Sequence, residues 1–161
     1  MQTRINPFAV TPEQRQEVAT LGSLASIVAA ADETGGSLGA IIQKVTKASN
    51  PPLHVHANED EAWLVIDGEI DFHLGDDVVR ATPGTFVFAP RGLPHSFDVV
   101  TPEAQLLILV TPGGFEGMFR ELGAPLGAAE GAPPIDPARV EEVAGRYGLE
   151  IVGPPPRSGG M

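Results

Sequence analysis

The chain has 161 residues, a formal net charge of −11 and no cysteine, and 42% of its residues are hydrophobic. This length suits one domain whose core needs no cross-links, and the absence of thiols excludes disulfides, thiolate metal sites and cysteine nucleophiles. The acidic balance argues against nucleic acid and anionic membranes as partners, because both are bound through clustered Lys and Arg. The apolar run 24–31 is too short to cross a bilayer. The residues before it mix Arg with Glu instead of forming a basic leader, so we expect a cytoplasmic protein.

The N-terminal region carries a helix start signal. Thr11 is a capping residue, Pro12 occupies the first helical position, and Gln14 follows three residues after the cap. This pattern predicts a short helix that ends at about Thr20. We expect residues 1–20 to form an extension outside the main domain.

Residues 21–112 contain closely spaced β-rich runs separated by turn residues. The first two runs, 24–30 and 38–45, flank Asp32–Gly36, which predicts a hairpin connection. Further strands are predicted over 53–56, 61–66, 69–74, 78–81, 85–89, 95–100 and 105–110. About nine short strands with a turn signal at nearly every junction are typical of a sandwich or a small barrel.

Residues 113–161 have a helical pattern and then a tail rich in Pro and Gly. The segment 115–122 places four apolar side chains on one helical face, namely Phe115, Met118, Phe119 and Leu122. A loop over 123–134 precedes Asp136 and Pro137, which cap and open a second helix that runs to about Tyr147. We expect the tail from Gly153 onward to fray.

Three of the four histidines belong to one ordered pattern. His54 and His56 are two residues apart in an extended segment, so their side chains point to the same face. Glu61 opens the next strand, and His95 opens a later one. Imidazole and carboxylate ligands together suit a divalent first-row transition metal, and iron, nickel, manganese, cobalt, copper and zinc all remain open.

These residues resemble a known family. The segment from His54 to Gly68, HVHANEDEAWLVIDG, resembles the first cupin motif, G(x)5HxH(x)4E(x)6G, and the block from Gly84 to His95 resembles the second, G(x)5PxG(x)2H. The chain departs from the motifs at two positions that supply no metal ligand in the family: Ala48 replaces a glycine and Val99 replaces an asparagine.

The resemblance implies an all-β cupin fold, a small β-barrel or jelly roll with a short N-terminal helix and C-terminal helices. It also implies one divalent metal ion held by His54, His56, Glu61 and His95. The distance to Gly68 favours Glu61 as the carboxylate ligand over its rival Glu59.

The segments 32–36, 111–119 and 146–155 extend the resemblance to bacterial monocupins described as quercetin 2,3-dioxygenase-like. For this chain, that resemblance implies a homodimer and a dioxygenase acting on a flavonol or a similar enolisable aromatic substrate. The metal would bind the enolic oxygen of the substrate, Glu61 would accept its proton as the catalytic base, and dioxygen would cleave the activated ring. Two alternatives remain open: a non-oxidative, metal-dependent polyketide cyclase or isomerase, and a non-catalytic cupin that binds a small molecule.

Four aromatic residues are candidates for contact with the substrate. Trp63 shares the strand parity of Glu61, and Phe97 shares that of His95, so both are expected to face the site or, alternatively, only to fill the core. Phe115 and Phe119 lie on a helix that would close the mouth of the site as a lid or, alternatively, only add to the core. The remaining histidine, His73, is expected to face solvent from a strand.

Overall fold

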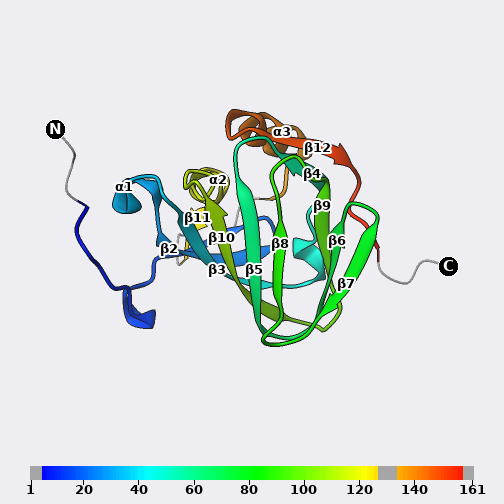
Figure 1. The fold of residues 1–161 in the computed structure, drawn as a ribbon, viewed down its shortest axis with the longest axis horizontal. Helices are drawn as coiled ribbons and strands as arrows, with labels where there is room; N and C mark the ends of the chain where they lie inside the picture. Colours follow the sequence, from blue (N-terminus) through cyan, green and yellow to red (C-terminus); the bar gives the residue numbers. More distant parts are fainter. Residues whose placement is uncertain (1–4, 127–133, 158–161) are drawn as a thin grey trace.

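The computed structural model describes residues 5–126 and 134–157, which form two antiparallel β-sheets and short helices (Figure 1). The seven-stranded sheet has the order β11 (Ala124–Pro125), β1 (Glu17–Thr20), β2 (Ser23–Ala29), β3 (Gly39–Val45), β10 (Ala104–Thr111), β5 (Asp60–Asp67) and β8 (Phe86–Ala89). The five-stranded sheet has the order β12 (Leu149–Gly153), β4 (Leu53–His56), β9 (His95–Val99), β6 (Ile70–Leu74) and β7 (Asp77–Ala81). The helices are α1 (Ala31–Thr34), α2 (Gly117–Leu122) and α3 (Pro137–Arg146), with 3-10 turns η1 (Pro12–Gln14) and η2 (Lys47–Ser49).

The core lies between the inner faces of the two sheets. Along β10, residues that alternate in sequence also alternate between buried and partly exposed, as expected for a strand with one face toward a core. Fully buried side chains come from both sheets and include Ile41 and Leu106 from one and Ile70 and Phe72 from the other. The all-β prediction is therefore confirmed in the form of a two-sheet jelly roll. Across the described residues, hydrogen bonding does not close the sheets into one continuous barrel.

The strands predicted between residues 24 and 111 are all present, with small shifts of their ends. The connection over 32–36 joins β2 to β3 as predicted, and it contains the single-turn helix α1. Gly35 ends that helix in the left-handed conformation, at φ 64°, which glycine adopts without steric cost.

The N-terminal helix is shorter than predicted. The capping interaction is present, since the Thr11 N–H donates to Gln14 Oε1 over 2.9 Å, but the helix stops after one 3-10 turn. Residues 17–20 instead form β1, because Leu21 and Gly22 adopt positive φ values of 50° and 70° and fold the chain back onto β2. This tight turn was hard to foresee, since leucine rarely takes a positive φ.

The C-terminal part adds two strands that were not predicted. Within the expected loop, Ala124–Pro125 pairs with β1 as β11, and the rest of that loop extends into residues outside the described ranges. After α3, Gly148 turns the chain at φ 73°, and Leu149–Gly153 pairs with β4 as β12. The ordered chain therefore continues through Gly153, where fraying was expected to begin.

Helix α3 lies at the top of the molecule in Figure 1, beside β12, and it contacts α2. Their buried residues include Met118 and Phe119 on α2 and Val143 and Ala144 on α3. The Tyr147 hydroxyl donates to Glu121 Oε2 over 2.9 Å and links the two helices. In the described residues, no helix has the length and apolarity needed to cross a membrane.

Candidate metal centre

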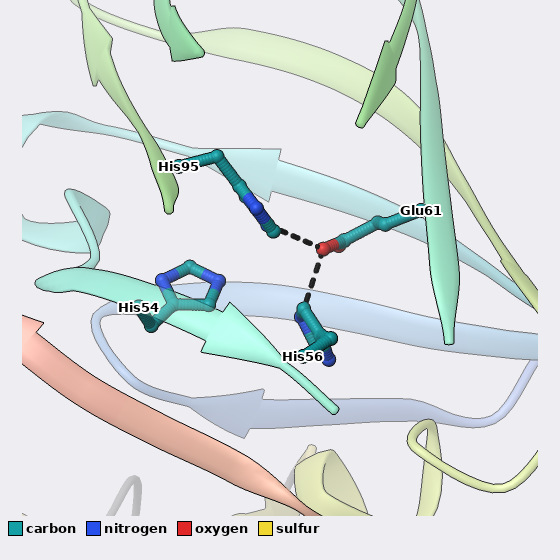
Figure 2. Close-up of side chains that lie close together, drawn as sticks. All are labelled: His54, His56, Glu61 and His95. Atoms are coloured by element: carbon teal, nitrogen blue, oxygen red, sulfur yellow. Dashed lines mark hydrogen bonds and ion pairs between the residues drawn. The ribbon is translucent and has the colours of Figure 1, made fainter. Parts of the chain in front are cut away.

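The four residues that the sequence singled out as ligands converge on one point inside the protein (Figure 2). One nitrogen from each of His54, His56 and His95 and one oxygen from Glu61 all lie within 4.8 Å of one another. All four side chains are buried. The histidines come from β4 and β9 of one sheet, where His54 is paired with His95, and the glutamate comes from β5 of the other. The pairing and packing of the sheets thus bring together residues that are up to 41 positions apart, from His54 to His95.

Backbone carbonyls fix the orientation of two of the imidazole rings. His54 Nδ1 lies 2.7 Å from the Pro52 carbonyl oxygen, and His95 Nδ1 lies 2.9 Å from that of Leu93. A carbonyl oxygen can only accept a hydrogen bond, so Nδ1 is the donor in both rings. This arrangement leaves Nε2 of each ring to face the centre, as is usual for histidines that bind metals.

A second carboxylate lies close to His56. Its Nδ1 lies 3.5 Å from Glu59 Oε2, and its Nε2 lies 2.9 Å from Glu61 Oε2. Glu59, the rival candidate for the carboxylate ligand, therefore lies on the outer side of the His56 ring. In this position it can orient the imidazole but does not belong to the converging group.

Glu61 Oε2 is the centre of the cluster, with His95 Nε2 at 3.0 Å and His56 Nε2 at 2.9 Å. The contact with His95 is a hydrogen bond, but the contact with His56 is close without being aligned as one. His56 Nε2 is thus a buried nitrogen whose bonding capacity is not met by the protein. Three inward imidazoles, one carboxylate and an unsatisfied nitrogen fit a divalent transition metal ion.

The protonation of the cluster follows from its burial and its charges. Burial, helped by the neighbouring His95, lowers the pKa of His54 to about 4, so this ring is neutral at pH 7. Burial alone would raise the pKa of Glu61, but the charge of His56 and the contacts with both rings hold it well below its usual range. Burial also opposes the charging of His56, yet Glu61 and Glu59 raise its pKa to about 9. Without an ion, the proton on His56 balances the Glu61 carboxylate, and a bound cation would replace that proton.

A cavity of about 460 Å³ adjoins the cluster and is lined by His54, Glu61 and His95. Its walls are mainly apolar and include all four aromatic residues predicted to contact a substrate, namely Trp63, Phe97, Phe115 and Phe119. The Phe115 ring meets His56 edge-on at 4.5 Å, and the Trp63 ring meets His95 at 5.3 Å. The predicted helix over 115–122 is shorter than expected, because α2 begins at Gly117 and Phe115 lies in the turn before it. Phe115 is buried in the core and also lines the cavity.

Sequence reasoning missed other parts of the wall. Gln43 and Ile108 reach the cavity from β3 and β10, and Val140 and Ala144 reach it from α3. The alternation of β3 could have placed Gln43 on the inner face together with Ile41. No local signal could have placed α3, because its position depends on packing against α2 and β12.

Two further residues, Val99 and His73, differ from what the sequence predicts. Where the family motif has asparagine, Val99 is fully buried, and its backbone N–H donates over 3.0 Å to the side chain of Asn50, which follows η2 and lines the cavity. A polar side chain thus reaches this region from another part of the chain. His73, expected to face solvent, is half-buried on β6 and lies outside the cluster.

Comparisons with known proteins agree with this architecture. Residues 42–112 match the family model described as Cupin domain. Quercetin 2,3-dioxygenase from Bacillus subtilis (strain 168) is 26% identical over 110 residues, which cover 68% of this chain and 33% of that protein, so the match spans about a third of the relative's length.

Solved structures show the same fold at low sequence identity. KdgF from Halomonas sp. has a TM-score of 0.60 and 21% identity, covering 70% of this chain and 98% of its own. An RmlC-like cupin from Shewanella frigidimarina has a TM-score of 0.60 and 18% identity, covering 70% and 96%. The chain thus has the fold of these solved structures, and its residues 42–112 match a cupin domain.

Proposed function

We propose that this protein is a metal-dependent dioxygenase that cleaves a flavonol, or a similar enolisable aromatic compound, with dioxygen. The observation that carries the proposal is the position of the His54, His56, Glu61 and His95 cluster at the wall of a mainly apolar cavity. The distant similarity to a quercetin 2,3-dioxygenase supports this choice of reaction among those that cupins catalyse.

The metal would be held by Nε2 of the three histidines and by the carboxylate of Glu61. A divalent ion in this position supplies Lewis acidity that makes the enol of a bound substrate easier to deprotonate. The protein itself supplies the base that accepts the substrate's proton. Glu61 is the candidate for this base, because it lines the cavity whereas His56 does not. Glu61 is ionised, as its lowered pKa requires, and can accept a proton from a substrate hydroxyl.

The walls of the cavity suit a flat and mostly apolar molecule. Trp63, Phe115 and Phe119 offer ring surfaces, and each is less than 10% exposed, so they exclude water from the cluster. A volume of about 460 Å³ lies within the range of pockets that bind ligands of drug-like size. The cavity can therefore admit a compound of two or three rings.

Gln43 provides a polar contact in another part of the same cavity. The Ser23 hydroxyl donates its one hydrogen to the Thr20 carbonyl oxygen over 2.8 Å, so it must accept from Gln43 Nε2, which lies 2.7 Å away. This orientation leaves Gln43 Oε1 as a hydrogen-bond acceptor for the cavity.

Gln43 lies well away from the metal cluster. Across the sheet, Glu61 is in register with Val110, and Val110 is in register with Gly39 on β3. Gln43 lies four residues beyond Gly39 on the same strand, which is about 13 Å. We therefore propose that the substrate carries a hydroxyl at the end opposite its enol and that Gln43 accepts a hydrogen bond from it.

The test is to load the purified protein separately with iron, nickel, manganese, cobalt, copper and zinc, and to follow quercetin absorbance and oxygen uptake together. We expect metal-dependent loss of quercetin with equimolar oxygen consumption, and the loss of both in Glu61→Gln, which keeps the wild-type circular dichroism. Metal-dependent turnover without oxygen uptake would replace the proposal by a non-oxidative reaction. Saturable binding without turnover would replace it by a binding function.

A further inference from the structure

The indole N–H of Trp63 is a buried hydrogen-bond donor without an acceptor. Trp63 is 2% exposed, and among the described residues its Nε1 has no hydrogen-bond partner. A buried indole nitrogen usually has an acceptor, because leaving a buried donor unsatisfied costs more free energy than a typical hydrogen bond contributes. An acceptor on a molecule that binds in the cavity would remove this cost.

The ring contacts and strand partners of Trp63 offer it no acceptor. Phe72, whose ring lies 5.1 Å from that of Trp63, is apolar, and so are the residues in register with Trp63, Val87 on β8 and Ile108 on β10. The ring of His95 lies 5.3 Å away, but both of its nitrogens already take part in hydrogen bonds. This leaves the cavity, which Trp63 lines, as the place from which an acceptor can come.

Trp63 lies between the two polar ends of the cavity. Along β5, Glu61, Trp63 and Val65 are successive inward residues. Gln43 on β3 is level with Val65, because both are in register with Leu106 on β10. A step of two residues along a strand is about 6.6 Å. The backbone position of Trp63 is therefore halfway between the level of the metal cluster and the level of Gln43.

We infer that the Trp63 N–H donates a hydrogen bond to an uncharged oxygen in the ring system of the ligand, between the enol at the metal cluster and the hydroxyl at Gln43. An oxygen without a proton suits this position, because the indole nitrogen can only donate. The inference rests on the proposed function for the placement of the two ends of the ligand. It makes Trp63 a residue that selects ligands by an acceptor atom as well as by ring contact.

The test exploits the fact that the chain contains one tryptophan, so that an isosteric analogue can replace Trp63 alone. Benzothienylalanine, which has sulfur in place of the indole N–H, keeps the size and ring surface of the side chain but cannot donate. The measurement is the dissociation constant of quercetin for the zinc-loaded, full-length protein without oxygen. We expect the analogue to weaken quercetin binding by about 5- to 50-fold, because the hydrogen bond to the ligand is lost. Zinc affinity is the control and should be unchanged, since the replaced atom is not a metal ligand.

The NMR signal of this single indole N–H gives a second measurement that needs no substitution. In the isotope-labelled, zinc-loaded protein we expect the signal to move downfield when quercetin binds, because a hydrogen bond deshields the proton. Equal quercetin affinity with and without the N–H, or an indole signal that does not move downfield, would overturn the inference and leave the proposed reaction intact. A Trp63 hydrogen bond to quercetin in a protein that consumes no oxygen would overturn the reaction and support the inference. A metal-loaded protein that does not bind quercetin would overturn both.

Discussion

Glu59 and Glu61 lie on opposite sides of one imidazole ring, with Glu59 Oε2 3.5 Å from His56 Nδ1 and Glu61 Oε2 2.9 Å from His56 Nε2. The two carboxylates are only two residues apart, yet the structure gives them different tasks. Glu61 faces the converging nitrogens, and Glu59 lies behind the ring.

This relationship predicts that Glu59 positions a ligand without being one. Glu59→Gln should weaken metal affinity by about 10- to 100-fold, because a neutral amide lacks the negative charge that orients the His56 ring. Competition with a chelator of known affinity measures the change. Glu150→Gln, an exposed position on β12, should leave the affinity unchanged. Equal affinities for wild type and Glu59→Gln would show that Glu59 has no part in the site.

The histidine pair on β4 should be indispensable for metal binding. His54→Ala combined with His56→Ala removes two of the three inward nitrogens, so the purified variant should contain no stoichiometric metal by plasma spectrometry. His73→Ala is the matched control, since His73 lies outside the cluster, and it should retain a full complement. A stoichiometric ion in the double variant would refute the site.

Metal binding should release protons near neutral pH. The pKa of His56 in the metal-free protein is raised to about 9, so its ring is protonated at pH 7.5, and a bound ion needs the lone pair that this proton occupies. We expect about one proton to be released per ion. Metal affinity should therefore rise with pH and level off above about 9. Titration calorimetry in buffers of different ionisation enthalpy measures the release, and a heat that is the same in every buffer would contradict it.

Gln43 should discriminate between ligands that differ in one hydroxyl. Gln43→Leu should weaken binding of quercetin by about 3- to 10-fold, because one hydrogen bond to the far hydroxyl is lost. The measurement is the dissociation constant of the metal-loaded protein without oxygen, so that no turnover occurs. A flavonol without hydroxyls on its terminal rings is the control, and it should bind both proteins alike. An equal loss for both ligands would mean that Gln43 only shapes the cavity.

Much of the centre could be predicted because its ligands are placed by local rules. The two-residue period of a strand puts His54 and His56 on the same face whatever surrounds β4. The same period placed Trp63 with Glu61, and Phe97 with His95, on the inner faces of their strands. Turn residues between short apolar runs likewise marked most strand boundaries, because Pro restricts the backbone locally and Gly frees it.

Tertiary structure decided what depends on partners distant in sequence. Residues 149–153 became a strand because β4 offered an edge with unpaired backbone groups, and α3 became a cavity wall by packing on α2 and β12. The motif spacing already favoured Glu61 as the ligand, but the position of Glu59 behind the His56 ring required the fold. The sequence by itself thus determined which side chains face inward along each strand, through the fixed geometry of the extended backbone. Only the packing of two sheets decided which of them meet, because that depends on contacts between residues far apart in the chain.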